Sequence, residues 1–152
     1  MRFLRHTFFV LSALLLCACQ QPSATFTDQH GHSLDARNHW LVVNYWATWC
    51  APCRKEIPEL NALAAQLTAK NISILGVNFD QLAGAKLIHA SQSLGIQFPV
   101  VIDDLAQRYN LPTHQGLPVT HIISPQGTLV ETLIGEQSQA SILQALQRLQ
   151  AL

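Results

Sequence analysis

Residues 44–58 of the chain read Asn-Tyr-Trp-Ala-Thr-Trp-Cys-Ala-Pro-Cys-Arg-Lys-Glu-Ile-Pro. This stretch contains the end of a β-branched and aromatic run, residues 41–47, which predicts a strand buried on both faces. A helix is expected to follow over residues 51–69, because apolar side chains recur there at three- and four-residue spacing. The stretch therefore predicts a strand-to-helix junction with two cysteines, Cys50 and Cys53, at the start of the helix.

The position of these two cysteines predicts a redox-active dithiol. The first N–H groups of a helix lack intrahelical partners and its dipole is positive at that end, so a thiolate on Cys50 is stabilised there. Cys53, one turn later, is expected to lie beneath Cys50 and to be more buried, where it can attack a mixed disulfide and release the substrate. Cys50 is thus the candidate attacking cysteine and Cys53 the candidate resolving one.

A pair of cysteines at this spacing can also form half of a zinc site. Such a site needs further Cys or His ligands. The other two cysteines, Cys17 and Cys19, lie near the N-terminus, and the histidines are scattered along the chain. We therefore expect no metal site and no cofactor.

Length and composition limit the range of possible functions. The 152 residues, of which 49% are hydrophobic and 12% charged, suffice for one compact domain and not for two. The formal net charge is zero, and after residue 5 no Lys and Arg cluster exceeds the pair Arg54-Lys55. The electrostatic footprint of a nucleic-acid partner is therefore absent, and we expect partners that are proteins or small thiols.

The N-terminal residues indicate a targeting segment. Arg2 and Arg5 precede the apolar run 7–16, which matches a secretory signal and is too short to span a bilayer. The run 16–19, Leu-Cys-Ala-Cys, resembles a bacterial lipobox, and it makes Cys19 the candidate lipidation site because the small Ala18 precedes it. An ordinary cleaved signal peptide without lipid is the alternative.

This interpretation divides the chain into three parts. Residues 1–18 are expected to be a lipoprotein signal peptide, residues 19–24 a tether, and residues 25–152 the folded domain. An exported dithiol works in the cell envelope, on the periplasmic side, where disulfides can persist. Gln20 after the lipidation site suggests, by resemblance to enterobacterial lipoproteins, the outer membrane.

The rest of the chain alternates predicted strands and helices. A short hairpin is expected over residues 25–34. Further strands are expected over residues 72–78, 98–102, 119–123 and 128–134, and further helices over residues 81–94, 103–109 and 138–149. This order of elements predicts an α/β fold with a largely parallel central sheet covered on both faces.

Three motifs together resemble a known family. Residues 44–58 look like the active-site segment of the thioredoxin-like fold, and more narrowly that of the membrane-anchored TlpA/ResA-type thiol-disulfide reductases. Residues 95–101 resemble part of an extra helix-strand unit in those proteins, and residues 116–120 resemble a third motif. The resemblance implies a thioredoxin-like fold with a central mixed sheet flanked by helices, an N-terminal hairpin and an inserted helix-strand unit.

The resemblance also implies a substrate-facing edge. The thioredoxin-like fold places a cis-proline opposite the dithiol, and Pro118 is the residue at that place. The backbone of Leu117 would then pair with an extended substrate segment beside Cys50. The alternative is that Pro118 only begins the strand 119–123, where no N–H is needed.

Glu56 is the candidate proton-handling group. Thioredoxin has a buried Asp at the place of Asn44, whose amide cannot titrate, whereas ResA-type proteins have a Glu at the position of Glu56. The alternative is that Glu56 is a solvated Glu in the first helical turn that stabilises the helix dipole. Trp49 is expected at the substrate-binding surface, and Tyr45 and Phe79 in the core.

The favoured function is a reductase of protein disulfides. By the resemblance, a membrane thiol-disulfide donor would reduce Cys50 and Cys53, which would then reduce an oxidised protein such as an apocytochrome c CxxCH site during cytochrome c maturation. An oxidant or isomerase would use the same cysteines in the opposite direction. A copper-binding chaperone on this fold would need a His ligand, for which His114 and His121 are weak candidates. A peroxiredoxin-like peroxidase is disfavoured, because this chain lacks the Pro and Thr that should precede the peroxidatic cysteine at fixed spacing.

Overall fold

The computed structural model of the chain describes residues 24–113, 115–149 and 151. The expected signal peptide, nearly all of the expected tether with Cys19, and His114 lie outside the described residues. The strands are β1 (Thr25–Thr27), β2 (Ser33–Asp35), β3 (Trp40–Trp46), β4 (Ile72–Asn78), β5 (Val119–Ile123) and β6 (Leu129–Ile134), and the helices are α1 (Ala51–Leu67), α2 (Gly84–Ser93), α3 (Leu105–Tyr109) and α4 (Gln139–Arg148). Within the described residues, no helix has the length and apolar character needed to cross a bilayer.

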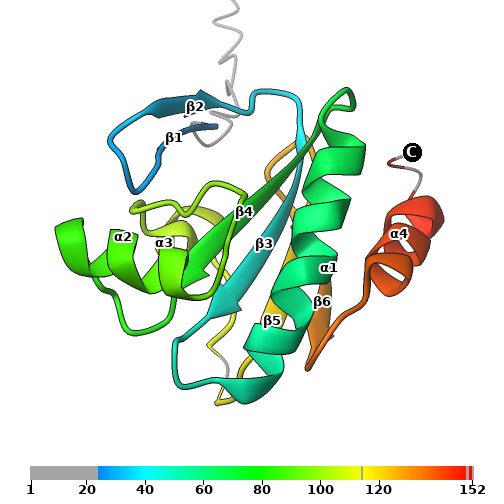
Figure 1. The fold of residues 1–152 in the computed structure, drawn as a ribbon. Coiled ribbons are helices and arrows are strands. Elements are labelled where there is room, and N and C mark those ends of the chain that lie inside the picture. The colour runs from blue at the N-terminus through cyan, green and yellow to red at the C-terminus, as the bar shows by residue number, and fades with distance from the viewer. Residues whose placement is uncertain (1–23, 114, 150, 152) are drawn as a thin grey trace, which may run out of the picture.

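A four-stranded sheet with the order β4-β3-β5-β6 forms the centre of the molecule (Figure 1). Strands β3 and β4 run parallel, whereas β5 is antiparallel to both β3 and β6. The expectation of a largely parallel sheet is therefore wrong, and the mixed sheet implied by the resemblance is confirmed. Two features leave β3 and β4 as the parallel pair of this sheet: the segment 98–102 adds only an isolated parallel bridge to β4, and a tight turn, in which Gly127 N–H donates to the Ser124 carbonyl at 2.8 Å, joins β6 to β5 as an antiparallel hairpin.

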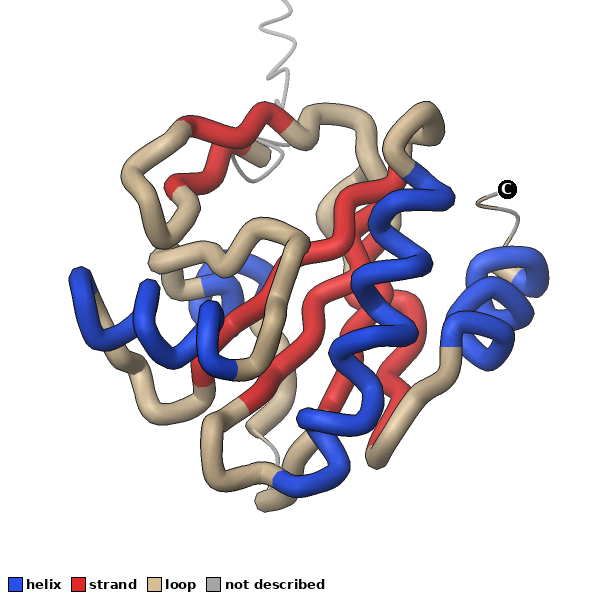
Figure 2. Tube along the Cα trace, viewed as in Figure 1, coloured by secondary structure: helices blue, strands red, loops and turns tan. Residues whose placement is uncertain are grey.

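Helices α1 and α4 cover one face of the sheet, and α3 with the hairpin β1-β2 covers the other. Figure 2 shows α1 crossing the strands with α4 beside it. Side chains along β3 alternate between these faces, so that Val42 packs with Leu60 and Ile142 while Val43 packs with Phe26 and Leu105. This alternation explains why β3 is apolar at nearly every position, as expected for a strand covered on both sides.

The inserted helix-strand unit differs from the expectation in both of its parts. Helix α2 begins at Gly84 rather than residue 81, because residues 79–83 form a turn in which Leu82 N–H donates to Asn78 Oδ1 at 3.0 Å. The segment 98–102 is not a full strand and forms only isolated bridges, from Val100 to Gly76 and from Val101 to Asp28. Its pairing with β4 is limited to this point because Pro99, whose nitrogen has the same orientation as that of Val101, has no N–H to donate, while Ile102 N–H donates on the other side to the Thr27 carbonyl at 3.0 Å.

The other expected elements are present with small shifts at their ends. Strands β1 and β2 pair antiparallel as the predicted hairpin. Helix α3 begins after Asp104, whose side chain accepts from Gln107 N–H at 2.9 Å. Helix α4 begins after Ser138, which forms a capping box with Ser141. Helix α1 ends at Leu67, two residues before the expected position.

Candidate active site

Cys50 and Cys53 form a disulfide at the junction of β3 and α1. The S–S distance is 1.97 Å and the Cα atoms are 5.3 Å apart. Cys50 is the N-cap of α1 with an extended backbone, and its Sγ lies 3.2 Å from the backbone nitrogen of Cys53, whose N–H donates to it. Cys50 is 3% exposed and Cys53 is fully buried. The arrangement matches the expected geometry of an outer and an inner sulfur, and the attacking and resolving roles stay predictions.

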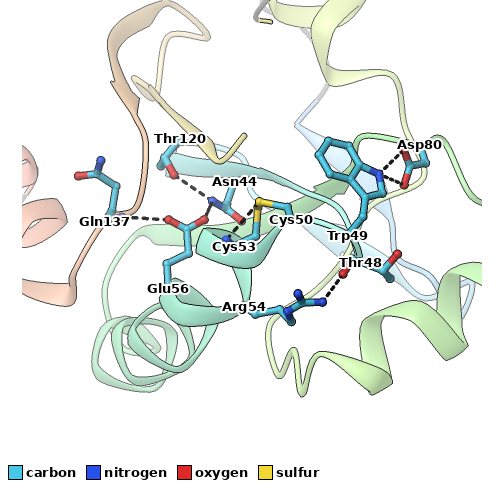
Figure 3. Close-up of a disulfide and its surroundings, with 10 residues drawn as sticks. All are labelled: Asn44, Thr48, Trp49, Cys50, Cys53, Arg54, Glu56, Asp80, Thr120 and Gln137. Carbon is cyan, nitrogen blue, oxygen red and sulfur yellow. Dashed lines mark hydrogen bonds between the residues drawn. A yellow bond between two sulfur atoms is a disulfide. The ribbon is translucent and has the colours of Figure 1, made fainter. Parts of the chain in front are cut away.

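Glu56 lies one turn after Cys53 and is buried, with 1% of its surface exposed. Its Oε1 accepts from Asn44 Nδ2 at 2.7 Å, and its Oε2 accepts from the backbone N–H of Gln137 at 3.0 Å. Asn44 Nδ2 also donates to Thr120 Oγ1 at 3.1 Å (Figure 3). The alternative of a solvated Glu in the first helical turn is therefore wrong, because the carboxylate points into the protein.

Burial raises the pKa of Glu56 to about 7, and the negative charge of Glu136 also raises this pKa. The hydrogen bonds from Gln137 and Asn44 act in the opposite direction, because they stabilise the ionised carboxylate. Near neutral pH, the protonated and ionised forms of Glu56 are therefore both populated. A carboxyl group in this state can take up or release a proton during a reaction at pH 7.

Two members of the hydrogen-bond network around Glu56 were not among the candidate residues from the sequence. The Gln137 contact uses a backbone N–H just before α4, 81 residues away, and therefore carries no side-chain signal. Thr120 lies opposite Asn44 in the pairing of β3 with β5. A signal for Thr120 existed, because this residue ends the third motif of the resemblance, residues 116–120.

Trp49 lies beside the disulfide on the side away from Glu56 (Figure 3). Its side chain is 60% exposed, and its Nε1 lies 3.1 Å from both carboxylate oxygens of Asp80. Its ring stands edge-on to Phe79 with 6.2 Å between the ring centroids. The expectation that Phe79 belongs to the core is wrong, because β4 ends at Asn78 and leaves Phe79 43% exposed in the loop that follows. The expected core position of Tyr45 is confirmed.

The third motif brings the residues directly before β5 to the dithiol through Leu117. The Leu117–Pro118 peptide bond is cis, as the resemblance implied, and Pro118 directly precedes β5. Leu117 packs against the buried cluster that contains both cysteines. The Pro118 carbonyl accepts from the backbone N–H of Gly135 at 2.9 Å. This carbonyl is therefore engaged within the protein.

His121 does not lie beside the cysteines. Its Nδ1 is 2.9 Å from Thr132 Oγ1, and its ring stands edge-on to Tyr45 with a centroid distance of 5.7 Å. Tyr45 belongs to the core on the sheet face away from α1. Among the residues that the structure describes, no three His, Cys, Asp or Glu side chains are grouped to hold a metal ion.

Comparison with known proteins assigns this site to a family. The sequence profile described as the AhpC/TSA family matches residues 19–132. The thiol-disulfide oxidoreductase ResA of Bacillus thuringiensis (strain Al Hakam) is 30% identical over 126 residues, which cover 81% of this chain and 72% of that protein. ResA of Bacillus subtilis (strain 168) is 28% identical over 124 residues, which cover 80% of this chain and 69% of that protein.

Solved structures share the fold at lower sequence identity. A putative thiol:disulfide interchange protein DsbE from Chlorobium tepidum aligns with a TM-score of 0.66 and 24% identity. The alignment covers 86% of this chain and 94% of the DsbE chain. StoA from Bacillus subtilis aligns with a TM-score of 0.62 and 19% identity, and the alignment covers 82% of this chain and 97% of the StoA chain. The thioredoxin-like fold implied by the resemblance is confirmed.

Proposed function

This chain belongs to the AhpC/TSA family as a ResA-like thiol-disulfide oxidoreductase, and we propose that it acts as a reductase of protein disulfides. The observation that supports this direction is the charge around the dithiol. A cysteine pair that is a strong oxidant has a reduced form that is stabilised relative to its disulfide. Nearby cations provide this stabilisation, because they favour the thiolate of the reduced form. Here the buried ionisable group one turn after Cys53 is the carboxyl of Glu56, whereas Arg54 and Lys55 are exposed to solvent. Such surroundings favour the disulfide over the dithiol and hence a low reduction potential.

The proposed reaction transfers two electrons from the dithiol to a substrate disulfide. The Cys50 thiolate attacks one substrate sulfur, a mixed disulfide forms, and the other substrate sulfur leaves as a thiolate. Glu56 in its ionised form takes the proton of the Cys53 thiol. The Cys53 thiolate then attacks Cys50 Sγ, which regenerates the disulfide and releases the second substrate sulfur as a thiolate. The two substrate thiolates become a dithiol by taking up one proton from protonated Glu56 and one from solvent.

Two further groups complete the proposed site. The backbone of Leu117, before the cis bond to Pro118, pairs with an extended substrate segment, and Trp49 contacts the same substrate from the other side of the sulfurs. The substrate class is an oxidised CxxCH segment, as in an apocytochrome c during cytochrome c maturation. A membrane thiol-disulfide donor returns the dithiol to its reduced form.

The proposed location is the periplasmic side of the bacterial cell envelope. Lipid attached to Cys19, after removal of residues 1–18, would anchor the domain to a membrane, and Gln20 favours the outer membrane. Metabolic labelling with a fatty acid tests this anchor. Label on the wild-type chain that disappears in Cys19→Ser supports it, and an unlabelled wild-type chain refutes it.

The exchange reaction is tested with a CxxCH peptide. Reduced protein is mixed with the oxidised peptide, quenched with acid and analysed by mass spectrometry. We expect reduced peptide and oxidised protein at equilibrium, and a trapped mixed disulfide through Cys50 in the Cys53→Ser variant. An equilibrium that leaves the peptide oxidised would show that the protein is not a reductase for this substrate.

A further inference from the structure

A cavity of about 580 Å³ lies at the edge of the sheet where the parallel strands β3 and β4 end. It lies between the loop that begins α2 and the segment that begins α3. Most of its lining side chains are apolar, among them Tyr45, Val77, Leu82, Leu87, Val101 and Leu111. Cavities of this size and lining are typical of binding sites for a side chain or a small ligand.

The cavity adjoins the residues around the disulfide. Phe79 lines the cavity and stands edge-on to Trp49, the residue before Cys50. On the inner side, Leu87 lines the cavity and packs in the same buried cluster as Cys50. Both contacts place the cavity one residue away from the surroundings of the reactive sulfurs.

Large exposed apolar side chains gather along this path. Trp49 is 60% exposed, Phe79 is 43% exposed, and Ile102, which also lines the cavity, is 57% exposed. Exposed apolar side chains that form a continuous path at a reactive group mark a binding surface, whereas isolated ones need no explanation. The surface formed by Trp49, Phe79, Ile102 and the cavity is called the docking surface below.

The docking surface carries negative charge. Asp103 and Asp104 line the cavity, and Asp80 lies beside Trp49. Asp103 is neutralised by Arg108, whose Nη2 lies 2.7 Å from its Oδ1, so Asp80 and Asp104 supply the net charge. No Lys, Arg or His is present among the described residues that line the cavity. A partner segment with basic side chains is therefore complementary in charge.

We propose that the docking surface binds the substrate polypeptide next to its disulfide, and that the preferred segment carries an apolar side chain beside a Lys or Arg. The apolar side chain enters the cavity past Phe79, and the basic side chain lies near Asp80 or Asp104. At about 3.3 Å per extended residue, a side chain three residues from the reacting cysteine reaches roughly 10 Å along this path. This inference rests on the proposed function, because it assumes a polypeptide disulfide as the substrate.

Two disulfide-bonded peptides test the proposal. They differ only at positions three and four from the reacting cysteine, where one carries Leu-Lys and the other Ser-Glu. Second-order rate constants with the reduced protein are measured by stopped-flow tryptophan fluorescence. We expect the Leu-Lys peptide to react about ten-fold faster, because burial of one apolar side chain supplies at least that factor.

Variants then locate the effect on the protein. Ile102→Glu is expected to bring the ratio of the two rate constants close to one. Asp80→Asn, which keeps the size of the side chain, is expected to lower the ratio by removing one negative charge. Val130→Glu is the matched control, because Val130 is 40% exposed on β6 and does not line the cavity, and the ratio is expected to stay at its wild-type value.

The outcomes separate this inference from the proposed function. Equal rate constants for the two peptides, or the same ratio in Ile102→Glu and Val130→Glu, would overturn the docking surface while leaving the reductase intact. Failure of both peptides to react would instead overturn the proposed function, and the docking surface with it.

Discussion

At the scale of single residues, Glu56 is the group whose environment departs most from that of a free side chain. It is a buried carboxyl with two hydrogen-bond donors, Asn44 and the backbone of Gln137, and no cation contacts it among the hydrogen bonds and ion pairs of the described residues. A group that served only stability would not be placed this way, because an ionised carboxylate loses solvation on burial. The position is better explained by proton transfer.

The first prediction concerns the kinetics of Glu56→Gln. In the wild type, the rate of substrate release should fall as the pH drops through about 7, because protonated Glu56 cannot accept the proton of Cys53. The variant should be slower by roughly 10²-fold at pH 8 and should lack this dependence near pH 7. Stopped-flow exchange rates between pH 5 and 9 provide the measurement.

Glu59→Gln is the control for this experiment. Glu59 is exposed on the next turn of α1 and, like Glu56, accepts from a backbone N–H near α4, that of Gln139 at 2.9 Å. Its replacement should leave the pH profile unchanged. The same profile in wild type and Glu56→Gln would remove Glu56 from the mechanism.

The second prediction concerns stability. The folded state raises the pKa of Glu56 from its usual 4.5 to about 7. The folded protein therefore loses stability as the pH rises from 4.5 to 7, by about 3 kcal/mol in all, and below 4.5 this loss is absent. Glu56→Gln cannot ionise and escapes the loss, so its free energy of unfolding relative to wild type should increase over this pH range.

Denaturant unfolding of both oxidised proteins at pH 4, 6 and 8 measures this difference. A constant offset between the two proteins would reflect only the altered hydrogen bonds of the Gln side chain. Such a result would contradict a raised pKa at Glu56.

At the scale of elements, β4 and the segment 98–102 depend on a glycine. A Cβ added at Gly76 would lie 3.1 Å from Phe98 Cε2, 3.1 Å from Trp46 Nε1 and 3.2 Å from Val100 Cγ2. All three side chains are buried, so none can move away freely. Gly76 also bonds to the segment through its own backbone, from its N–H to the Pro99 carbonyl at 2.8 Å.

The third prediction is that Gly76→Ala destabilises the protein by roughly 1–3 kcal/mol through overpacking. Gly116→Ala is the matched control, because nothing lies within 4 Å of a Cβ there. It should change the free energy of unfolding by less than about 0.5 kcal/mol. Equal losses in both variants, measured by urea unfolding, would show that the packing around Gly76 does not limit stability.

The sequence was most informative for elements with a strong local pattern. Strands β3 and β4 and helix α1 were predicted closely, because their apolar residues follow one period over many positions. The segment 98–102 was predicted as a strand, but it forms only isolated bridges because Pro99 has no N–H to donate to β4, and pairing partners are not visible in the sequence. Phe79 was wrongly expected in the core although the end of β4 at Asn78 was predicted, because its ring packs against the exposed Trp49, a contact that the sequence does not show.

At the scale of the whole molecule, the two sides of the disulfide have different environments. Glu56, Asn44 and Thr120 lie on one side, and Trp49 with Asp80 lies on the other (Figure 3). The sequence indicated Glu56 and Trp49 through the resemblance of residues 44–58. It could not indicate the contact with Gln137 or the cavity, because both depend on segments brought together by folding.

The direction of electron flow is a property of the whole site, and the reduction potential of the Cys50–Cys53 pair measures it most directly. The helix N-terminus stabilises the Cys50 thiolate, whereas the buried Glu56 opposes it, and the balance determines the potential. Equilibration of the protein with a redox buffer at pH 7, followed by alkylation and mass spectrometry, gives its value. We predict a potential near or below thioredoxin's, about −270 mV, and a value near about −120 mV would contradict the assignment as a reductase.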